Sequence, residues 1–337
     1  MAASGGSGSD ERDGVSLTNL DQPLFPDANA TKRDLVDYLD AMAGPIIAAL
    51  RDRPLSVIRV LRGQDPFMQK NLPKYAPPWI KSVSQWAEAS RREVKYALCD
   101  DRRTLMWFAN QRAVEYHPAL VRTERWDRQT HLILDIDPPA AVDSPDPSGA
   151  AGSAASASSF ALAVRAAHLV HRALEDSGLA GVVKTSGAKG LHVFVPLDAE
   201  PGIEDVAAAT RALAARAERL DPELATTAFI REDRGGKVFI DSTRAGGATV
   251  VAAYSPRVRP NAPVSFPLAW DQIDDVVPAD FTVRTAARLA GGRDRWAELM
   301  PPPQSLSADL IAEGHAIPIA RVQAMHEGKR RARARRG

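Results

Sequence analysis

HLILDIDPP, residues 131–139, is the stretch on which the interpretation of this chain turns. It is an apolar, strand-forming run with two acids one residue apart, Asp135 and Asp137, and it stops at two prolines. Side chains alternate between the faces of a strand, so both carboxylates point to one face while Leu134 and Ile136 pack behind them. Two such carboxylates repel each other unless a cation lies between them, and Mg²⁺ and Mn²⁺ both favour carboxylate oxygen. The alternative is a strand end with two solvated acids.

The order of elements around this strand predicts a particular sheet. Helices are expected at 160–177 and 203–220, and further strands at 181–185, 191–197, 237–242 and 249–254. Together with the strand at 131–137 this gives β-α-β-β-α-β, the split βαβ pattern of ferredoxin-like and RNA-recognition-motif sheets. The same sheet forms the palm of many polymerases, although a fold alone does not establish a function.

A second motif is KTSGAKGLHVFVPL, residues 184–197, where a glycine-containing turn joins two strands. Ser186 and Gly187 lie in this turn, whose backbone N–H groups can form a nest for an anion, and Lys189 adds positive charge. His192 begins the following strand. The G-x-x-x-x-G-K-[ST] order of a Walker A loop is absent. The alternative is an ordinary glycine-rich hairpin with an exposed lysine and histidine.

A third acid, Asp241, lies within the apolar strand KVFIDST at residues 237–243. An acid in such a strand is costly to bury without a partner or a metal. In the βαββαβ arrangement this strand shares a sheet with Asp135 and Asp137, so Asp241 can complete a site of three carboxylates. The alternative is that Asp241 simply pairs with Arg244 or Lys237.

Arginines cluster near this third strand. Arg257 and Arg259 are two residues apart in AYSPRVRPNAPVSFPL, and Arg234 precedes the Asp241 strand. A guanidinium binds pairs of oxygen atoms in a bidentate way, which suits a triphosphate better than a lysine does.

The preceding part of the chain is predicted to be mixed α/β. Thr31 caps a helix, with Asp34 three residues on, and Gly44–Pro45 interrupts that helix. Short strands are expected at 55–61, 94–98 and 105–108. Residues 1–15, rich in Gly, Ser and Asp, are expected to be disordered. The low-complexity segment at about 140–159 is expected to be a flexible surface loop.

Composition excludes several classes of protein. The 337 residues contain 45% hydrophobic and 25% charged side chains, as in an ordinary globular protein. The single cysteine, Cys99, excludes an internal disulfide and a cysteine-rich zinc site, and fits a reducing cytoplasm. No secretion signal and no membrane-spanning run is visible. The tail KRRARARRG, residues 329–337, carries six basic residues, while the rest of the chain has 37 basic against 42 acidic residues. Such a tail is typical either of a basic arm that binds the phosphate backbone of a nucleic acid or of a disordered, solubilising terminus.

The succession of these motifs resembles a known family. DxD, then SGxKGxH, then an acid on a strand is similar to the archaeo-eukaryotic primase superfamily, specifically the polymerase domain of bacterial ligase D. Further matching blocks are LTNLDQPLFPDANATKRDLVDYL, FMQKNLPKYAPPW, WFANQRAVEYHP, KVFIDST and AYSPRVRPNAPVSFPL, so the resemblance covers roughly residues 15–300.

The resemblance implies roles for individual residues. The catalytic, metal-binding triad would be Asp135, Asp137 and Asp241, holding two Mn²⁺ or Mg²⁺ ions. The residues implied to contact the incoming nucleotide are Ser186, Gly187, Lys189, His192, His117, Arg234 and Arg257. Those implied to contact DNA are Lys32, Phe67, Met68 and Lys70, with Phe67 stacking on the template base. Met68 and Gln22 depart from the family, which often has a second aromatic and a lysine there.

The fold implied is α+β, a primase-polymerase fold with an RRM-like βαββαβ palm and an N-terminal α/β subdomain. We expect a catalytic domain at 16–300, with its N-terminal part at about 16–125 and its palm at about 126–260, followed by an extension at 301–337 that ends in the basic tail. No ligase or nuclease module is expected after it, so the chain resembles a stand-alone member.

The function implied is a template-directed nucleotidyltransferase in DNA repair. It would add rNTPs or dNTPs to a primer 3′-hydroxyl at short gaps or broken double-stranded ends, as in non-homologous end joining. Its expected surroundings are the cytoplasm and the nucleoid, with a DNA end-binding protein and a separate ligase as partners. Two alternatives stay open at this point: a metal-dependent nuclease or phosphohydrolase, and a non-catalytic nucleic-acid-binding module.

Overall fold

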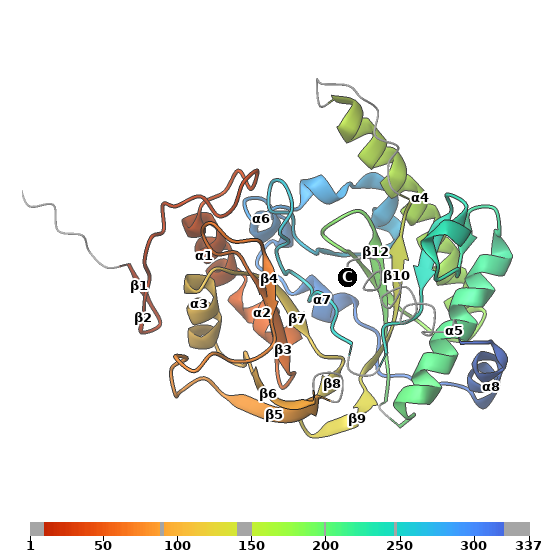
Figure 1. Ribbon diagram of the computed structural model, residues 1–337. Helices are drawn as coiled ribbons and strands as arrows, with labels where there is room; N and C mark the ends of the chain where they lie inside the picture. The colour runs from red at the N-terminus through yellow and green to blue at the C-terminus, as the bar shows by residue number, and fades with distance from the viewer. Residues whose placement is uncertain (1–9, 88–90, 140–149, 199, 246–247, 320–337) are drawn as a thin grey trace, which may run out of the picture.

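Two β-sheets, each with its own helices, make up most of the molecule (Figure 1). The fold is that of a computed structural model, which describes residues 10–87, 91–139, 150–198, 200–245 and 248–319. The basic tail lies outside these ranges. None of the helices described is both long enough and apolar enough to cross a membrane.

The larger sheet, the palm, is built around β10, His131–Asp137. This strand pairs antiparallel with β12, Leu191–Pro196, on one side and with β14, Val238–Asp241, on the other. β12 pairs in turn with β11, Val182–Thr185. The short strands β13, Ala225–Thr226, and β15, Pro267–Leu268, complete the sheet order β13-β14-β10-β12-β11-β15. The predicted βαββαβ palm is therefore confirmed, because its four strands lie in the ferredoxin-like order β14-β10-β12-β11.

Two helices cover one face of the palm: α4, Ala150–Glu175, and α5, Ile203–Leu220 (Figure 1). Leu132, Leu134 and Ile136 of β10 point to this face and join the main hydrophobic core. Side chains alternate along the strand, so Asp135 and Asp137 emerge on the other face. That face turns toward the N-terminal part of the chain, where Ile133 packs against Leu120.

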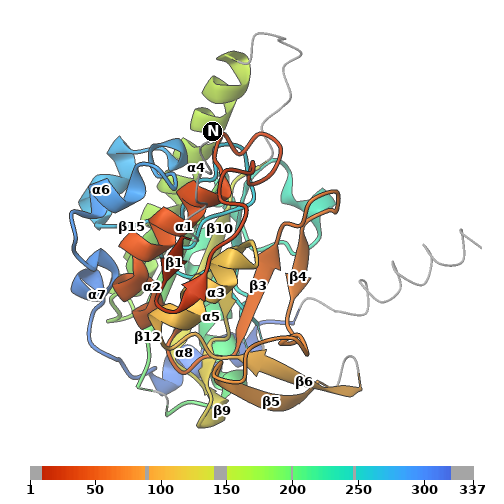
Figure 2. The same ribbon diagram turned by 90° about the vertical axis from the view of Figure 1, so that its left-hand side faces the viewer.

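The N-terminal part forms the second sheet, in the order β4-β3-β6-β5, with β7 also paired to β3 (Figure 2). Its strands are β3, Leu55–Arg59; β4, Phe67–Gln69; β5, Ser82–Ala87; β6, Arg92–Ala97; and β7, Ala113–Pro118. Its helices are α1, Lys32–Ala41; α2, Ala43–Leu50; and α3, Arg102–Asn110. The predicted cap is confirmed, because the Thr31 side chain accepts from the Asp34 backbone N–H and the Asp34 side chain accepts from the Thr31 backbone N–H.

Buried hydrogen bonds join this part to the palm side of the molecule. The Tyr38 hydroxyl donates to the Tyr254 carbonyl at 2.7 Å. The Tyr116 backbone N–H donates to Ser255 Oγ at 2.9 Å, and the Tyr116 carbonyl accepts from the Ala252 N–H at 2.9 Å. The segment after β14 therefore fixes the two sheets against each other.

The remaining elements are short. β1, Glu11–Arg12, pairs with β2, Val15–Ser16, and β8, Val121–Arg122, pairs with β9, Arg125–Gln129. After the palm come α6, Ala286–Ala290; α7, Arg295–Leu299; α8, Ala308–Ala316; and 3₁₀ turns at Arg231–Arg234, Trp270–Asp275 and Pro278–Asp280.

Two predicted strands are wrong. Residues 105–108 belong to α3, because Asp101 caps the helix by accepting from the Thr104 N–H and the apolar residues cover several faces of it. Residues 249–254 form no strand but a single bridge, Ala119 with Thr249. Their backbone is bonded instead to β7 and to the segment before β15.

Three predicted boundaries also shift. Helix α1 ends before Met42, and Gly44–Pro45 lies in the first turn of α2, where a proline needs no N–H partner. Residues 10–15 are ordered, because Asp13–Gly14, both with positive φ, make the turn between β1 and β2. Residues 150–159 are helical, as their alanine content favours, while 140–149 lie outside the described residues.

Candidate active site

Asp135 and Asp241 face each other across neighbouring strands. They are direct partners in the antiparallel pairing of β10 with β14, so their side chains leave the sheet on the same face. Both residues are 6% exposed. Asp137, two residues along β10, is on that face as well and is more exposed. The structure thus brings the three predicted acids together at the end of β10.

Arg244 lies between these acids. Its Nη2 donates to Asp135 Oδ2 at 2.9 Å and is 3.5 Å from Asp241 Oδ2. This pairing is the one that the sequence left open as the simpler explanation of Asp241, whereas Lys237 donates to the Pro222 carbonyl. The Asp241 carboxylate also accepts from the N–H and hydroxyl of Thr243, at 2.8 and 2.6 Å.

The acids differ in their protonation. Burial opposes the charged form of Asp135, but the neighbouring His192 and Arg244 outweigh it and lower its pKa below the usual range. Burial, with the charges of Asp135 and Asp241, raises the pKa of Asp137 to about 6. The negative charge on this face therefore exceeds what Arg244 neutralises.

These acids suit a divalent cation by their chemistry, since all three are hard oxygen donors on one face. Within the described ranges, however, no three His, Cys, Asp or Glu side chains already converge as metal ligands. Arg244 occupies the position between Asp135 and Asp241 that a cation would take. Metal binding at this site would require the guanidinium to move.

The glycine turn between β11 and β12 lies beside β10. Ser186 Oγ accepts from the backbone N–H groups of Ala188 and Gly190, both at 3.2 Å. A Cβ on Gly190 would be 2.0 Å from the Ile136 carbonyl oxygen, so only glycine lets the turn approach β10 this closely. Gly187 has φ +68°, and Lys189 is exposed at the tip.

His192 connects this turn to the acids. It is the direct partner of Asp135 in the pairing of β10 with β12, and its Nε2 is 3.2 Å from Asp135 Oδ1. Its other ring nitrogen, Nδ1, is 2.8 Å from Lys184 Nζ. Burial and the nearby Lys184 lower the pKa of His192 to about 4, so its imidazole is neutral at pH 7.

Glu115 of β7 gathers two further predicted residues. Its Oε2 is 2.8 Å from His117 Nε2 and 3.1 Å from Arg257 Nε, and its Oε1 accepts from the Val258 N–H at 2.8 Å. Burial would raise the pKa of Glu115, but His117, Arg257 and Val258 together lower it to about 2. Arg257 also donates to the Ser186 carbonyl. His117 and Arg257 are thereby joined to the glycine turn.

The sequence did not indicate Glu115 or Lys184 as functional residues. Glu115 was visible only as part of the E-Y-H-P block, and Lys184 only as the first letter of the glycine-turn motif. Arg234, which was predicted, lies with its guanidinium 3.7 Å from the centre of the Phe239 ring. Phe239 is the pairing partner of Asp137, so Arg234 covers the side of the site near that acid.

The residues predicted to contact DNA lie elsewhere, in the N-terminal part. Phe67 and Met68 belong to the strand β4, with Met68 44% exposed, and Lys70 is exposed just after it. The Lys32 side chain is buried, and its Nζ donates to the Thr18 carbonyl and to Asn110 Oδ1, both at 2.6 Å. The ammonium of Lys32 is therefore already bonded within the protein.

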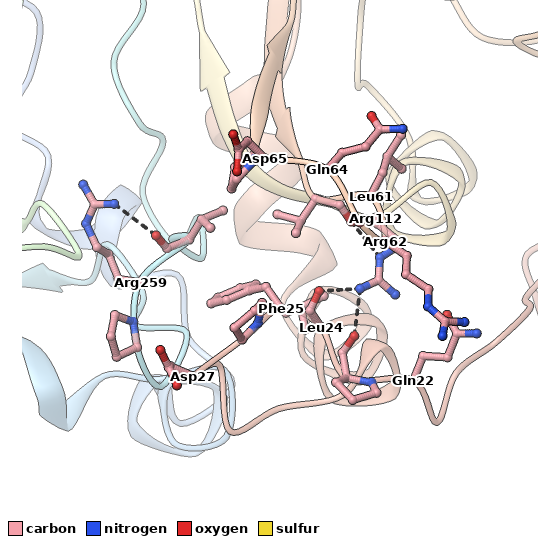
Figure 3. A pocket seen from close by; sticks show the side chains of 17 residues that line it. Gln22, Leu24, Phe25, Asp27, Leu61, Arg62, Gln64, Asp65, Arg112 and Arg259 are labelled. Atoms are coloured by element: carbon pink, nitrogen blue, oxygen red, sulfur yellow. Dashed lines mark hydrogen bonds between the residues drawn. The ribbon is translucent and has the colours of Figure 1, made fainter.

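A pocket of about 970 Å³ is lined in part by residues 60–66, which directly precede β4 (Figure 3). It is walled by residues 22–27, 60–66 and 258–260, and Gln22 is among them. Arg112 holds two of these walls together, because it donates to the Val60 carbonyl at 2.7 Å and to the Pro23 carbonyl at 2.8 Å. The exposed Arg62 and Arg259 line the pocket together with the acids Asp27 and Asp65, so the pocket carries charges of both signs.

Comparisons with known proteins agree with this architecture. The family model described as LigD, primase-polymerase domain, matches residues 31–296. The chain is 30% identical over 276 residues to the bifunctional non-homologous end joining protein LigD of Bacillus subtilis, covering 80% of this chain and 41% of that protein. It is 32% identical over 281 residues to the multifunctional non-homologous end joining DNA repair protein LigD of Mycobacterium tuberculosis, covering 80% of this chain and 34% of that protein.

The chain thus spans about two fifths and one third of the length of these two relatives. A solved structure, the polymerase domain from Mycobacterium tuberculosis ligase D in complex with DNA, superposes with a TM-score of 0.71 at 28% identity. That match covers 84% of this chain and 96% of the solved one, which confirms the predicted fold class. On the family model and the two relatives together, the chain belongs to the LigD primase-polymerase domain family.

Proposed function

We propose that the protein is a template-directed nucleotidyltransferase that adds rNTPs or dNTPs to a primer 3′-hydroxyl at short gaps or broken DNA ends. The observation that carries this proposal is the grouping on one palm face: Asp135 opposite Asp241, Asp137 beside them, and His192 leading into the glycine turn. Carboxylates for a cation and a turn for phosphates are the two parts that phosphoryl transfer needs.

Asp135, Asp137 and Asp241 would hold two Mn²⁺ or Mg²⁺ ions. When bound, such ions supply charge neutralisation for the attacking hydroxyl and the leaving pyrophosphate. The protein's own share is to hold the acids on a rigid sheet, where Asp135 and Asp241 are fixed by strand pairing. Arg244 would leave the acids as they take up the cation.

The triphosphate would lie along the glycine turn. His192 presents its Nε2 on the same face as the acids, and Lys189 is free to reach outward from the tip. Arg257 and His117 would bind phosphate or sugar oxygens from the other side, held in position by Glu115. His192 is buried and His117 and Arg257 are held by Glu115, and donors oriented in this way lose little entropy when a ligand binds.

The DNA would cross the N-terminal sheet and the palm face. Phe67 and Met68 would contact the template base, while Lys70 and the arginines of the pocket would bind the phosphate backbone. The names of the relatives support a place in non-homologous end joining. A DNA end-binding protein and a separate ligase would then act on the same break, at the bacterial nucleoid.

Two alternatives are less well supported. A metal-dependent nuclease also needs paired carboxylates, but it has no use for the phosphate turn beside them. A non-catalytic module on an RRM-like sheet would use exposed aromatic side chains as stacking platforms. Here Phe194 and Phe239 lie on the relevant face but are buried, Phe194 against Trp296 and Phe239 under Arg234.

Primer extension across a short gapped duplex tests the proposal. With Mn²⁺ or Mg²⁺ and rNTPs or dNTPs, wild-type protein should lengthen the primer and release pyrophosphate, and Asp137→Ala should lose at least about a hundredfold of that rate. Asp274→Ala, which changes an exposed acid paired with His168, is the control and should keep full activity. Equal extension by wild type and Asp137→Ala would refute the triad, and DNA shortening instead of lengthening would favour the nuclease.

A further inference from the structure

A separate cavity lies at the seam between the N-terminal part and the palm. Its volume is about 210 Å³, and its lining comes from α2 and β7 on one side, from β10 and β12 on the other, and from residues 250–253 and α7 (Figure 1). The three acids of the candidate active site are not part of this lining. Ala48, Arg122 and Ala297 are exposed residues of the lining, so the cavity opens to solvent.

Arg53 is a buried cation in the wall of this cavity. The residue is 7% exposed, and its guanidinium donates to the Ala119 carbonyl at 3.2 Å and to Thr130 Oγ1 at 2.7 Å. A guanidinium has five N–H groups, so three of them find no acceptor within the described ranges. No carboxylate of the described residues forms an ion pair with Arg53 either. A cation buried in this way is costly until an anion approaches it.

The neighbouring basic groups do not change this balance. Arg122 is already paired, because its Nη1 is 3.3 Å from Asp52 Oδ2. Burial, with the charges of Arg53 and Arg122, lowers the pKa of His131 to about 3, so its imidazole is neutral at pH 7. Burial, with the charge of Arg122, lowers the pKa of Arg53 to about 10, so its guanidinium stays charged at pH 7.

One acid, Asp294, also lines the cavity, but its charge is stabilised from elsewhere. Its Oδ1 accepts from the Tyr254 hydroxyl at 3.2 Å and from the Ala297 N–H at 3.2 Å, where it caps α7. A carboxylate at the start of a helix is stabilised by the helix dipole as well. Asp294 therefore has donors of its own, whereas Arg53 has N–H groups to spare.

Most of the remaining lining is apolar. Leu120, Phe194 and Val250 are buried, and Trp296 packs edge-on against Phe194 with the ring centres 5.0 Å apart. A cavity of about 150 Å³ is enough for a benzene ring, so this one has room for a ring and a carboxylate. A bare inorganic anion would leave the apolar wall facing water. The lining thus suits a ligand with an anionic head and an apolar body.

We propose that this cavity binds a small organic anion, a carboxylate on an aromatic or branched aliphatic body, with the carboxylate on Arg53. The planar guanidinium matches the two oxygen atoms of a carboxylate, and the body would lie against Phe194 and Trp296. Such a ligand contacts the N-terminal part and the palm at once, so it stabilises the folded protein. It needs neither metal nor nucleotide, and the proposal is therefore independent of the proposed function.

Benzoate is the probe, because it consists of one ring and one carboxylate. Calorimetric titration of the whole chain without metal at pH 7 should give a Kd of about 1 mM or tighter, and the melting temperature should rise with benzoate. Nitrogen NMR of the tryptophan indoles locates the ligand. The Trp296 signal, assigned among the six tryptophans by its loss in Trp296→Phe, should shift most. A Kd weaker than about 10 mM, or an unmoved Trp296 signal, would overturn the proposal.

Variants of the lining test the site itself. Arg53→Met should weaken benzoate binding at least about tenfold, the worth of one hydrogen bond to a charged group. Ala48→Phe narrows the mouth from an exposed position on α2 and should weaken it as much. Ala161→Phe, which adds the same ring to an exposed alanine of α4, is the matched control and should bind like wild type. Unchanged binding by Ala48→Phe would refute the site even if Arg53→Met fails to fold.

Analogues of benzoate test the chemistry of the ligand. Benzyl alcohol, which has the ring without the charge, and inorganic phosphate, which has charge without the ring, should each bind at least about tenfold more weakly than benzoate. Equal binding of either would contradict an organic anion as the ligand. Tighter binding of benzylamine would mean that Asp294 selects the ligand and would also overturn the proposal. A protein that binds benzoate but extends no primer would refute only the polymerase function.

Discussion

At the scale of single residues, the bridge made by Arg244 determines how the acids behave before a metal arrives. The guanidinium contacts Asp135 and Asp241 and is itself only 38% exposed. It stabilises the two carboxylates in the metal-free protein and must be displaced by any cation that replaces it. If the proposed cation binds here, Arg244 and that ion would compete for the same oxygens.

We expect Arg244→Gln to bind Mn²⁺ several times more tightly than wild type, because the competing cation is gone. The melting temperature of the metal-free variant should fall, since Asp135 and Asp241 then repel each other without a bridge, while that of the Mn²⁺-loaded variant should change less. Electron paramagnetic resonance of free Mn²⁺ measures the affinity. Arg165→Gln removes the same charge from an exposed site on α4 and should alter neither quantity. Weaker Mn²⁺ binding by Arg244→Gln would contradict the competition.

Metal binding should also depend on pH through Asp137. Its pKa is raised to about 6, so between about pH 4 and pH 6 the folded, metal-free protein holds a proton that the unfolded chain has lost. The contribution of Asp137 to the free energy of unfolding is therefore full at low pH and is lost as the pH rises through 6. Mn²⁺ must displace that proton, so its affinity should rise by up to about tenfold per pH unit up to pH 6 and level off above. Titrations from pH 5 to pH 8 test this, and Asp137→Asn should flatten the profile.

The acids of the site could be predicted from the sequence because strand alternation alone puts Asp135 and Asp137 on one face. The position of Asp241 in the same sheet could be predicted from the βαββαβ order of elements, which makes β14 a neighbour of β10. Glu115 could not be found in this way, since its partners Arg257 and Val258 are more than 140 residues away and meet it only in the folded chain. The site roles themselves stay predictions.

At the scale of elements, the packing of α8 on α5 depends on one glycine. A Cβ on Gly314 would lie 1.8 Å from the Ala208 carbonyl oxygen, and backbone atoms cannot yield as a side chain does. Polar contacts surround this point: Glu313 forms ion pairs with Arg216 and Arg219, and His315 Nε2 lies 2.8 Å from Asp205 Oδ1. With a larger residue at position 314, α8 could not pack this closely on α5. The polar contacts on either side of Gly314 also oppose a shift of α8 to another position on α5.

Gly314→Ala should lower the free energy of unfolding by about 3 kcal/mol or more, by forcing α8 away from α5. Gly44→Ala is the matched control, since nothing lies within 4 Å of its added Cβ and it is in the helix α2. That change should be neutral or stabilise by up to about 1 kcal/mol. Urea denaturation followed by circular dichroism measures both. Equal stability of the two variants would mean that α8 is not held at this point.

The sequence predicted elements well where local signals agreed with the tertiary structure, as in β10, β12 and α5. It failed at residues 105–108, whose short apolar run suits a strand or a buried helix equally and is decided by the cap at Asp101. It failed at 249–254 because β propensity does not reveal whether a partner strand is available. Helix α4 starts earlier than predicted because residues 150–159 are rich in alanine, which favours a helix. The low complexity of the same residues had suggested a flexible loop instead.

At the scale of the whole molecule, a second charged surface lies in a pocket whose lining does not include Asp135, Asp137 or Asp241. The pocket between residues 22–27, 60–66 and 258–260 carries Arg62 and Arg259 together with Asp27 and Asp65 (Figure 3). Two of its lining segments, residues 60–66 and 258–260, are almost 200 residues apart in the chain, so the pocket exists only in the complete fold. If the proposed function holds, the arginines of this pocket would bind DNA in addition to the palm face.

The double variant Arg62→Gln/Arg259→Gln should bind gapped DNA more weakly, and its dependence on salt should be shallower. Each lost phosphate contact reduces the slope of log affinity against log salt by about 0.9, so up to about 2 for the pair. Fluorescence anisotropy at several salt concentrations measures the slope. Arg165→Gln/Arg293→Gln, which removes two other exposed charges, should leave it unchanged. An unaltered slope in the first variant would place the DNA elsewhere.

The position of α8 on α5 has a practical consequence for experiments with the protein. Because α5 covers the face of the palm opposite Asp135, the helix that rests on α5 ends at Ala316 on the far side of the sheet from the acids. A fluorophore or a surface linker attached to the outer side of α8 would therefore orient the molecule with its acidic face outward. Single molecules immobilised in this way would keep that face open to DNA supplied from solution.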